Sequence, residues 1–268
     1  MQDTAGDIRM SWRESGHGAP VILLHAFPLH GAMWEPQLRD LPERWRWVAP
    51  DLRGFGETER GDGEGPIGMD LLADDVVALM DRLDIERAAV CGLSMGGYVA
   101  FALWNWHPDR IDSLVLCDTR AGADTEQGRR DRFATIERVR AADSAAPLVE
   151  SLLPKLLSDA TRRERRSVVE RVRTMIEEAA PESVIDALQG MAERPDSTEL
   201  LPEIDVPALV VVGEHDPITT RQDAEFLVAE MQDARLAVVP EAAHLSNLEH
   251  PRAFNRSLVQ FLEAIQGH

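Results

Sequence analysis

One short segment has the residue types and spacing of a nucleophilic serine. Gly92-Leu93-Ser94-Met95-Gly96 follows the apolar run Ala88–Cys91 and precedes a stretch of helical character, Met95–Trp106. This segment matches the Gly-x-Ser-x-Gly nucleophile elbow, a sharp strand-to-helix turn in which the serine is exposed and the glycines avoid steric clashes. The sequence therefore predicts that Ser94 is a nucleophile. The alternative is a glycine-rich turn that only packs helix against strand, a role that Gly97 can serve in either case.

A histidine and a carboxylate are expected to complete the site, because a serine hydroxyl is a weak nucleophile until a neighbouring base removes its proton. Asp216 follows the apolar run 208–212, and His244 follows the run 235–239. Both residues come directly after a predicted strand, where a rigid sheet presents catalytic groups on loops. We predict that His244 is the general base and that Asp216 orients it.

Other residues compete for these two roles. Asp118 ends the predicted strand 113–118 and could reach the same histidine, although a hydrogen-bonded loop anchor is the other role open to it. His215 is adjacent to Asp216 in the chain and is expected to point elsewhere. His250 precedes a proline at a predicted helix start and is expected at the surface.

Acyl transfer also needs hydrogen-bond donors for the oxyanion of the tetrahedral intermediate. We expect one donor to be the backbone N–H of Met95, the residue after the nucleophile. The other should come from the loop His25-Ala26-Phe27-Pro28, which follows residues 21–24, and we assign it to Phe27, since Pro28 has no N–H. The side chain of His25 in this loop is interpreted as a buried structural histidine.

Metal and cofactor motifs are absent from the sequence. There is no Cys-x-x-Cys, no His-Glu-x-x-His and no Gly-x-Gly-x-x-Gly, so we expect neither a metal nor a cofactor. Asp51-Leu52-Arg53-Gly54-Phe55-Gly56 only superficially resembles a glycine-rich phosphate loop, and it is interpreted as a tight turn after a strand. The two cysteines, Cys91 and Cys117, lie in apolar runs and are predicted to be buried thiols.

Charge and hydropathy narrow the classes of partner. A formal net charge of −19 repels phosphate backbones and anionic membranes, so neither nucleic acid nor a membrane is an expected partner. No run of about 18 apolar residues occurs, and residues 1–7 lack the features of a signal peptide. We expect a cytoplasmic monomer or homodimer that acts on a small molecule.

The elements that would position these residues alternate between short β-branched runs and amphipathic helical stretches. This alternation is typical of a mostly parallel, doubly wound sheet with helices on both faces. Strands are predicted at 21–25, 46–49, 88–92, 113–118, 208–212 and 235–239, with an edge strand near 8–12. Helices are predicted at 70–82, 95–106, 221–231 and 251–265.

The alternation is interrupted between residues 121 and 200, where the sequence is helical with no intervening strand. Residues 1–120 and 201–268 would therefore form the core, and residues 121–200 a helical lid over the carboxyl edge of the sheet. Apolar residues recur on one helical face in two places. They are Phe133, Ile136 and Val139, and, within the predicted helix Thr161–Glu178, Val168, Val169, Val172, Met175 and Ile176.

From residue 121 to residue 180 the charges nearly balance, with 12 basic and 11 acidic side chains, unlike those of the whole chain. The simpler interpretation is that its arginines and glutamates pair along solvated helix faces. A sharper hypothesis is that one or two of these arginines receive a carboxylate of the substrate. The pocket itself is expected to be lined by Phe27, Trp34, Met95, Leu245 and apolar residues of the lid.

Taken together, these segments resemble the α/β-hydrolase superfamily over nearly the whole chain. The resemblance rests on His25-Ala26-Phe27-Pro28, Asp51–Gly56, Gly92–Gly97, Gly213–Pro217 and His244. Cys91–Gly97 and His244–Glu249 are similar to the small cytoplasmic carboxylesterases and the 3-oxoadipate enol-lactonase group. This resemblance implies cofactor-free hydrolysis of a small carboxylic ester or lactone by a Ser-His-Asp triad. The loop His25–Pro28 departs from the enol-lactonase pattern and resembles the commoner esterase version.

A serine as nucleophile argues against haloalkane dehalogenases and epoxide hydrolases, which use aspartate in this fold. Perhydrolases, carbon-carbon bond hydrolases and proline iminopeptidases share the triad and stay open as alternatives. So does a ligand-binding protein that kept the fold and lost turnover.

Overall fold

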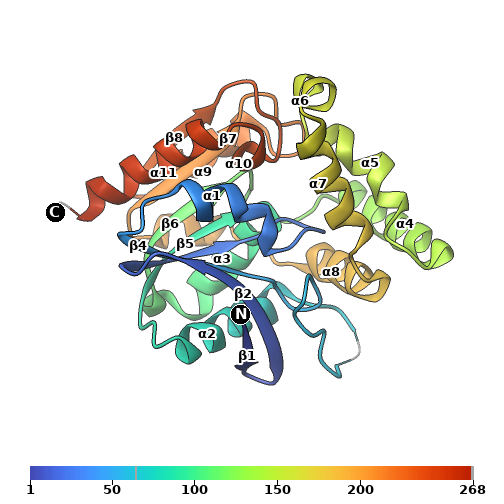
Figure 1. Ribbon diagram of the computed structural model, residues 1–268, viewed down its shortest axis with the longest axis horizontal. Coiled ribbons are helices and arrows are strands. Elements are labelled where there is room, and N and C mark those ends of the chain that lie inside the picture. The colour runs from blue at the N-terminus through green and yellow to red at the C-terminus, as the bar shows by residue number, and fades with distance from the viewer. Residues whose placement is uncertain (64, 267–268) are drawn as a thin grey trace.

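Eight strands form one sheet in the computed structural model, which describes residues 1–63 and 65–266 (Figure 1). Their order across the sheet is β1-β2-β4-β3-β5-β6-β7-β8. Six strands, in the order β4, β3, β5, β6, β7 and β8, pair in parallel. Strand β2 pairs in antiparallel fashion with β1 on one side and with β4 on the other. Their bounds are β1 Gln2–Ala5, β2 Ile8–Ser15, β3 Ala19–Leu24, β4 Trp45–Pro50, β5 Ala88–Leu93, β6 Ile111–Cys117, β7 Ala208–Gly213 and β8 Ala234–Val239.

The central strands are apolar because helices cover both of their faces. Every residue of β5 and of β7 is buried, as expected for parallel strands that have no solvated side. In the register of the sheet, Gly92 at the end of β5 lies between Leu24 of β3 and Leu116 of β6. Parallel pairing therefore brings the carboxyl ends of these strands, and the loops that follow them, to one edge of the sheet.

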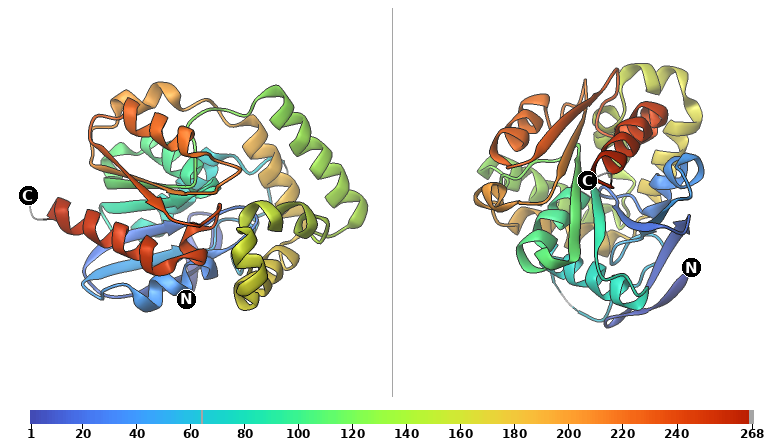
Figure 2. Two further views of the ribbon diagram at one scale, coloured as in Figure 1. Left: turned by 90° about the horizontal axis from the view of Figure 1, so that it is seen from above. Right: turned by 90° about the vertical axis from the view of Figure 1, so that its left-hand side faces the viewer.

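Helices pack on both faces of this sheet. The right-hand view of Figure 2 shows α1 and α11 on one face and α2, α3 and α9 on the other. Helix α3 is apolar on nearly all sides because it is buried between the sheet and its neighbours. These helices are α1 Glu35–Asp40, α2 Met69–Arg82, α3 Met95–Trp106, α9 Arg221–Glu230, α10 Ser246–Glu249 and α11 Pro251–Gln266, with short 3₁₀ segments at Gly31–Trp34, Pro108–Arg110 and Thr198–Glu203.

Five helices between β6 and β7 form what is called here the helical block, on the right in Figure 1. They are α4 Glu126–Ala142, α5 Pro147–Leu156, α6 Asp159–Glu164, α7 Arg166–Glu177 and α8 Pro181–Glu193. The block contacts loops at the carboxyl edge of the sheet: the Leu245 N–H, after β8, donates to the Leu156 carbonyl at 3.0 Å. Arginines and acidic residues pair along its helix faces, as in Arg130–Glu126 and Arg173–Glu177.

The α/β architecture expected from the sequence is confirmed, with differences in detail. All seven expected strands are present, but β1 and the six-residue helix α1 were not predicted. The predicted helix Thr161–Glu178 is two helices, because Arg165 leaves the helical conformation at φ −121°, ψ 63°. Phe133, Ile136 and Val139 share the helix α4, but Ile136 and Val139 are buried, whereas Phe133 is 41% exposed.

The remaining expectations concern membrane spans, metals and cysteines. Within the described residues, no helix is long and apolar enough to cross a membrane, and no cluster of potential metal-binding side chains occurs. Cys91 and Cys117 are buried free thiols, as expected, with their Sγ atoms 3.8 Å apart. Burial raises the pKa of the Cys117 thiol well above its ordinary value, which keeps this sulfur protonated and unreactive.

Candidate active site

Ser94 lies at the turn between β5 and α3 with a backbone that side chains rarely adopt, φ 56° and ψ −110°. Such a conformation costs about 1–3 kcal/mol and persists only when its surroundings hold it. Here the Ser94 N–H donates to the Cys117 carbonyl at 2.9 Å, and the Ser94 carbonyl accepts the Thr119 hydroxyl at 2.9 Å. Both bonds come from β6 and the residues after it, so the sheet itself holds the turn.

The glycines of this turn are required by close approaches. A Cβ at Gly92 would lie 2.2 Å from the Gly96 carbonyl oxygen, and a Cβ at Gly96 would lie 2.3 Å from the Leu24 oxygen. Gly97 packs in the same way on Thr119. The first and last glycines of the motif therefore allow the helix to begin directly against β3 and β5.

Asp216 and His244 are brought together from the loops after β7 and β8. The His244 Nδ1 and the Asp216 Oδ2 are 2.8 Å apart, and both side chains are nearly inaccessible to solvent. Asp216 also accepts the Thr219 hydroxyl on Oδ2 at 2.6 Å, and the N–H groups of Ile218 and Thr219 on Oδ1 at 2.8 and 3.1 Å. Four donors therefore fix the orientation of this carboxylate.

This environment sets the charge of Asp216 and the tautomer of His244. Burial acts to raise the pKa of Asp216, but the neighbouring His244 and the hydrogen bonds from Thr219 and Ile218 outweigh it and lower the pKa below its ordinary value. An ionised Asp216 can only accept, so His244 donates through Nδ1. The ring nitrogen Nε2 then carries a free lone pair, which is the form that a general base needs.

Within residues 1–63 and 65–266, the hydroxyl of Ser94 makes no hydrogen bond. The His244 ring bonds there through Nδ1, and its Nε2 has no hydrogen-bond partner among these residues. Ser94 is half-buried and His244 is 1% exposed. In unliganded active sites the bond between nucleophile and base is often long and tightens when substrate binds.

Asp118, the competing carboxylate, contacts different groups. Its Oδ1 accepts the Gly213 N–H at 2.7 Å and its Oδ2 accepts the Ser246 hydroxyl at 2.5 Å. Burial, together with the charges of Asp216 and Glu249, raises the pKa of Asp118 well above its ordinary value. Asp118 therefore joins the loops that carry Asp216 and His244, and its side chain makes no hydrogen bond to the His244 ring.

The two expected oxyanion donors have no acceptor within the described part of the chain. Neither the Phe27 N–H nor the Met95 N–H makes a hydrogen bond there. More than 90% of buried backbone N–H groups in proteins are paired, so the free N–H of Met95, a fully buried residue directly after Ser94, is notable. Both N–H groups are available to a negatively charged oxygen.

The loop that carries Phe27 is held by a buried histidine. The His25 Nε2 accepts the Leu52 N–H at 2.9 Å, and Nδ1, 3.0 Å from the Ala26 carbonyl, is therefore the protonated nitrogen. Burial lowers the pKa of His25 to about 4, so the ring is neutral near pH 7. This is the structural role expected for His25.

The turn Asp51–Gly56 also supports this loop. Asp51 is fully buried and accepts the N–H groups of Gly31 at 2.8 Å and Glu57 at 3.1 Å, while Arg13 donates to it at 2.8 Å. The turn therefore connects the segments after β3 and β4, which agrees with the interpretation as a tight turn.

The four residues expected to line the substrate pocket are mostly inaccessible. Trp34, Met95 and Leu245 are 0% exposed and Phe27 is half-buried, with its ring edge-to-face to Phe55. A cavity of about 310 Å³ lies next to Phe27 and is lined by Pro28, His30, Phe55, Met175 and Ala179 among others. This cavity lies between the loop that carries Phe27 and the residues that directly follow α7.

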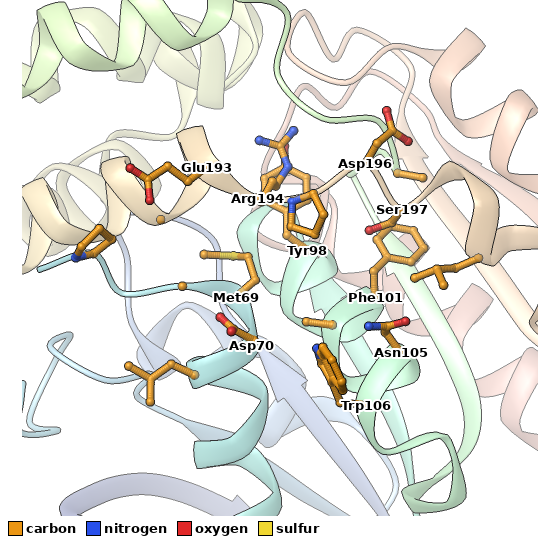
Figure 3. A pocket seen from close by; sticks show the side chains of 18 of the residues that line it. Met69, Asp70, Tyr98, Phe101, Asn105, Trp106, Glu193, Arg194, Asp196 and Ser197 are labelled. Atoms are coloured by element: carbon orange, nitrogen blue, oxygen red, sulfur yellow. The ribbon is translucent and has the colours of Figure 1, made fainter.

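A larger cavity, of about 670 Å³, lies elsewhere, between α2, α3 and the segment after α8. Figure 3 shows Tyr98 near its centre, with Arg194 directly above and Trp106 below. The Arg194 guanidinium lies 4.0 Å from the Tyr98 ring centroid and is paired with Asp124. Neither this cavity nor the smaller one is lined by Ser94, Asp216 or His244.

Sequence reasoning missed two residues that shape the site. Thr219 binds Asp216 through both its hydroxyl and its N–H, and the spacing Asp-x-x-Thr is a signal that could have identified it. Glu249 is 1% exposed and accepts the Ala243 N–H, next to His244. Of the two histidines that competed with His244, His215 is exposed, and His250, expected at the surface, is half-buried.

Comparisons with known proteins agree with this architecture. Residues 19–251 match the family model described as alpha/beta hydrolase fold. The chain is 31% identical to 3-oxoadipate enol-lactonase 1 of Acinetobacter baylyi over 237 residues, which covers 88% of this chain and 85% of that protein. It is 28% identical to a pimeloyl-[acyl-carrier protein] methyl ester esterase of Neisseria meningitidis, with 91% and 94% covered.

Two solved structures are similar over nearly their full length. A thermophilic esterase from Thermogutta terrifontis superposes with a TM-score of 0.94 at 37% identity, covering 99% of this chain and 98% of the other. The enol-lactonase from Burkholderia xenovorans LB400 superposes with a TM-score of 0.90 at 28% identity, covering 98% and 100%. This chain therefore belongs to the α/β-hydrolase family, and its relatives include esterases and enol-lactonases.

Proposed function

We propose that this protein hydrolyses a small carboxylic ester or lactone through an acyl-enzyme, with Ser94 as nucleophile, His244 as general base and Asp216 as its orienting acid. The observation that carries the proposal is the buried His244–Asp216 pair, whose bonding leaves Nε2 free. The His244–Asp216 pair lies at the same carboxyl edge of the sheet as Ser94, which is held in a strained turn. The names of the relatives support the same class of reaction.

In the proposed first half-reaction, the Ser94 oxygen bonds to the ester carbonyl carbon while its proton passes to the His244 Nε2. The N–H groups of Phe27 and Met95 donate to the resulting oxyanion, an interaction of the kind whose loss typically costs about 10²–10³ in rate. The carbon-oxygen bond to the leaving group breaks, and that oxygen takes the proton from His244. Asp216 stabilises the imidazolium in between.

In the second half-reaction, His244 takes a proton from water as the water oxygen bonds to the acyl carbon. Collapse of the second tetrahedral intermediate breaks the bond to Ser94, and His244 returns the proton to the serine. The products are a carboxylic acid and an alcohol, or a single hydroxy or oxo acid when the substrate is a lactone. No cofactor enters the sequence of steps.

A fluorophosphonate probe followed by peptide mass analysis tests the nucleophile. We expect labelling at Ser94, loss of labelling in Ser94→Ala, and retention in Ser144→Ala, a control in the connection between α4 and α5. Labelling nowhere, with no hydrolysis of any substrate tried, would refute the proposal and favour a protein that only binds its ligand.

A substrate panel separates the ester from the lactone, which is the second candidate because several relatives are named enol-lactonases. Short nitrophenyl esters, simple lactones and an aminoacyl nitroanilide would be compared by kcat/KM. We expect the esters to be hydrolysed best. A strong preference for lactones would favour the enol-lactonase group, and a preference for the anilide would indicate a peptidase.

A further inference from the structure

One buried carboxylate joins the loop of His244 to the helical block. Glu249, in the short helix α10, is 1% exposed. Its Oε1 accepts the N–H of Ala243, the residue before His244, at 2.6 Å, and its Oε2 accepts the N–H of Ser158, the N-cap of α6, at 2.8 Å. Each oxygen thus holds one backbone donor, and the two donors belong to different parts of the molecule.

Neighbouring contacts reinforce the same connection. The Leu245 N–H donates to the Leu156 carbonyl at 3.0 Å, and the Arg165 side chain donates to the Glu249 carbonyl oxygen. The residues on both sides of His244 are therefore hydrogen-bonded to the helical block. Leu245 bonds to it directly, and Ala243 is connected to it through the Glu249 carboxylate.

Nothing in the described chain neutralises this carboxylate by an ion pair. No arginine, lysine or histidine within residues 1–63 and 65–266 lies within salt-bridge distance of the Glu249 side chain. Burying a carboxylate without a cation is costly unless hydrogen bonds compensate for the lost solvation. Here the two N–H groups of Ala243 and Ser158 compensate for the lost solvation. The carboxylate therefore needs both donors, and it holds both segments in place.

We propose that Glu249 is a positioning residue that couples the helical block to His244, an inference that rests on the proposed function. Its carboxylate binds the N–H groups of both Ala243 and Ser158, so it holds the position of His244 fixed relative to the helical block. Asp118 performs the complementary task through Ser246, joining the other side of the same loop to the sheet.

Glutamine at position 249 tests the link with little change of volume. A glutamine side chain offers one acceptor oxygen and one NH₂ group, so one of the two backbone N–H groups would face another donor. We expect kcat to fall about 10- to 100-fold in Glu249→Gln, because a displacement of about 1 Å of a catalytic group can cost that much. KM should change far less, and the rate of fluorophosphonate labelling should fall together with kcat.

The same link can be broken from the other side by removing a single N–H. Ser158 has φ −60° and Leu157 before it is extended, with φ −126° and ψ 137°, so proline fits this position. Ser158→Pro removes the N–H that donates to Glu249, whereas Ser158→Ala keeps it. Both variants lose the capping hydroxyl that accepts the Thr161 N–H, so their difference isolates the link to Glu249.

The decisive measurement compares kcat and labelling rate across these variants, well below their melting temperatures. We expect Ser158→Pro to be about tenfold slower than Ser158→Ala, and the double variant with Glu249→Gln to be no slower than the slower single variant. Equal kcat for the Ser158 pair would overturn the inference, as would a folded Glu249→Gln protein with parental kcat. An unlabelled, inactive parent would instead refute the proposed function.

Discussion

Replacing Asp216 by asparagine would change the protonation of His244 without changing the size of its partner. Asp216 Oδ1 accepts two backbone N–H groups, from Ile218 and Thr219, which would select the asparagine carbonyl oxygen at that position. The NH₂ group would then occupy the position of Oδ2, 2.8 Å from the His244 Nδ1. The ring would have to accept at Nδ1 and carry its proton on Nε2, where it cannot take one from Ser94.

The expected loss of kcat is about 10⁴-fold, the cost of holding a triad histidine in the wrong tautomer. At about 1.36 kcal/mol for each factor of ten, this corresponds to about 5.5 kcal/mol of transition-state stabilisation. The binding of substrate does not use Nε2 as a base, so KM should change far less than kcat. The assay is steady-state hydrolysis of the best ester from the panel, with active sites counted by fluorophosphonate labelling.

Asp118→Asn is the matched control, because it changes a second buried carboxyl group of the same site. Its raised pKa favours a neutral acid, which an amide imitates: the amide oxygen can accept the Gly213 N–H while the NH₂ group donates to the Ser246 hydroxyl. We expect this variant to lose less than about tenfold in kcat. If Asp118→Asn were the more damaging change, the assignment of the acid to Asp216 would be wrong.

Three further outcomes follow from the same structure. Ser94→Ala and His244→Ala should each remove nearly all ester hydrolysis, and substantial remaining turnover in either variant would contradict its role. Gly96→Ala should lower the melting temperature and the soluble yield, because its Cβ would lie 2.3 Å from the Leu24 oxygen; a parental melting temperature would refute this account of the turn. The pKa of His25 is lowered from 6.5 to about 4, so the unfolded chain binds the proton more readily and stability is lost as the pH falls from 6.5 towards 4. Urea unfolding at pH 7 and pH 4 should show a decrease about 3 kcal/mol larger in the parent than in His25→Gln, and equal decreases would contradict it.

Much of the fold is visible in the sequence because its signals are local. Buried parallel strands appear as apolar runs, and the glycines around Ser94 are required by contacts with adjacent strands. The segments that sequence patterns missed have weak local signals. Strand β1 is short and mostly polar, and α1 has only six residues. The break at Arg165 carries neither glycine nor proline, so the apolar periodicity runs through it.

The sequence favoured Asp216 over Asp118 as the acid, but both residues come at or just after the end of a predicted strand, so Asp118 stayed a competitor. The tertiary structure shows how their contacts differ: one carboxylate meets His244, and the other meets Gly213 and Ser246. The contact of Glu249 with Ser158 was not visible in the sequence, because the two residues are 91 positions apart in the chain. The sequence by itself determined seven of the eight strands, the serine turn and the candidates for each role, because near neighbours govern these features. Only folding decided which buried polar groups meet, because each must find a partner once water is excluded.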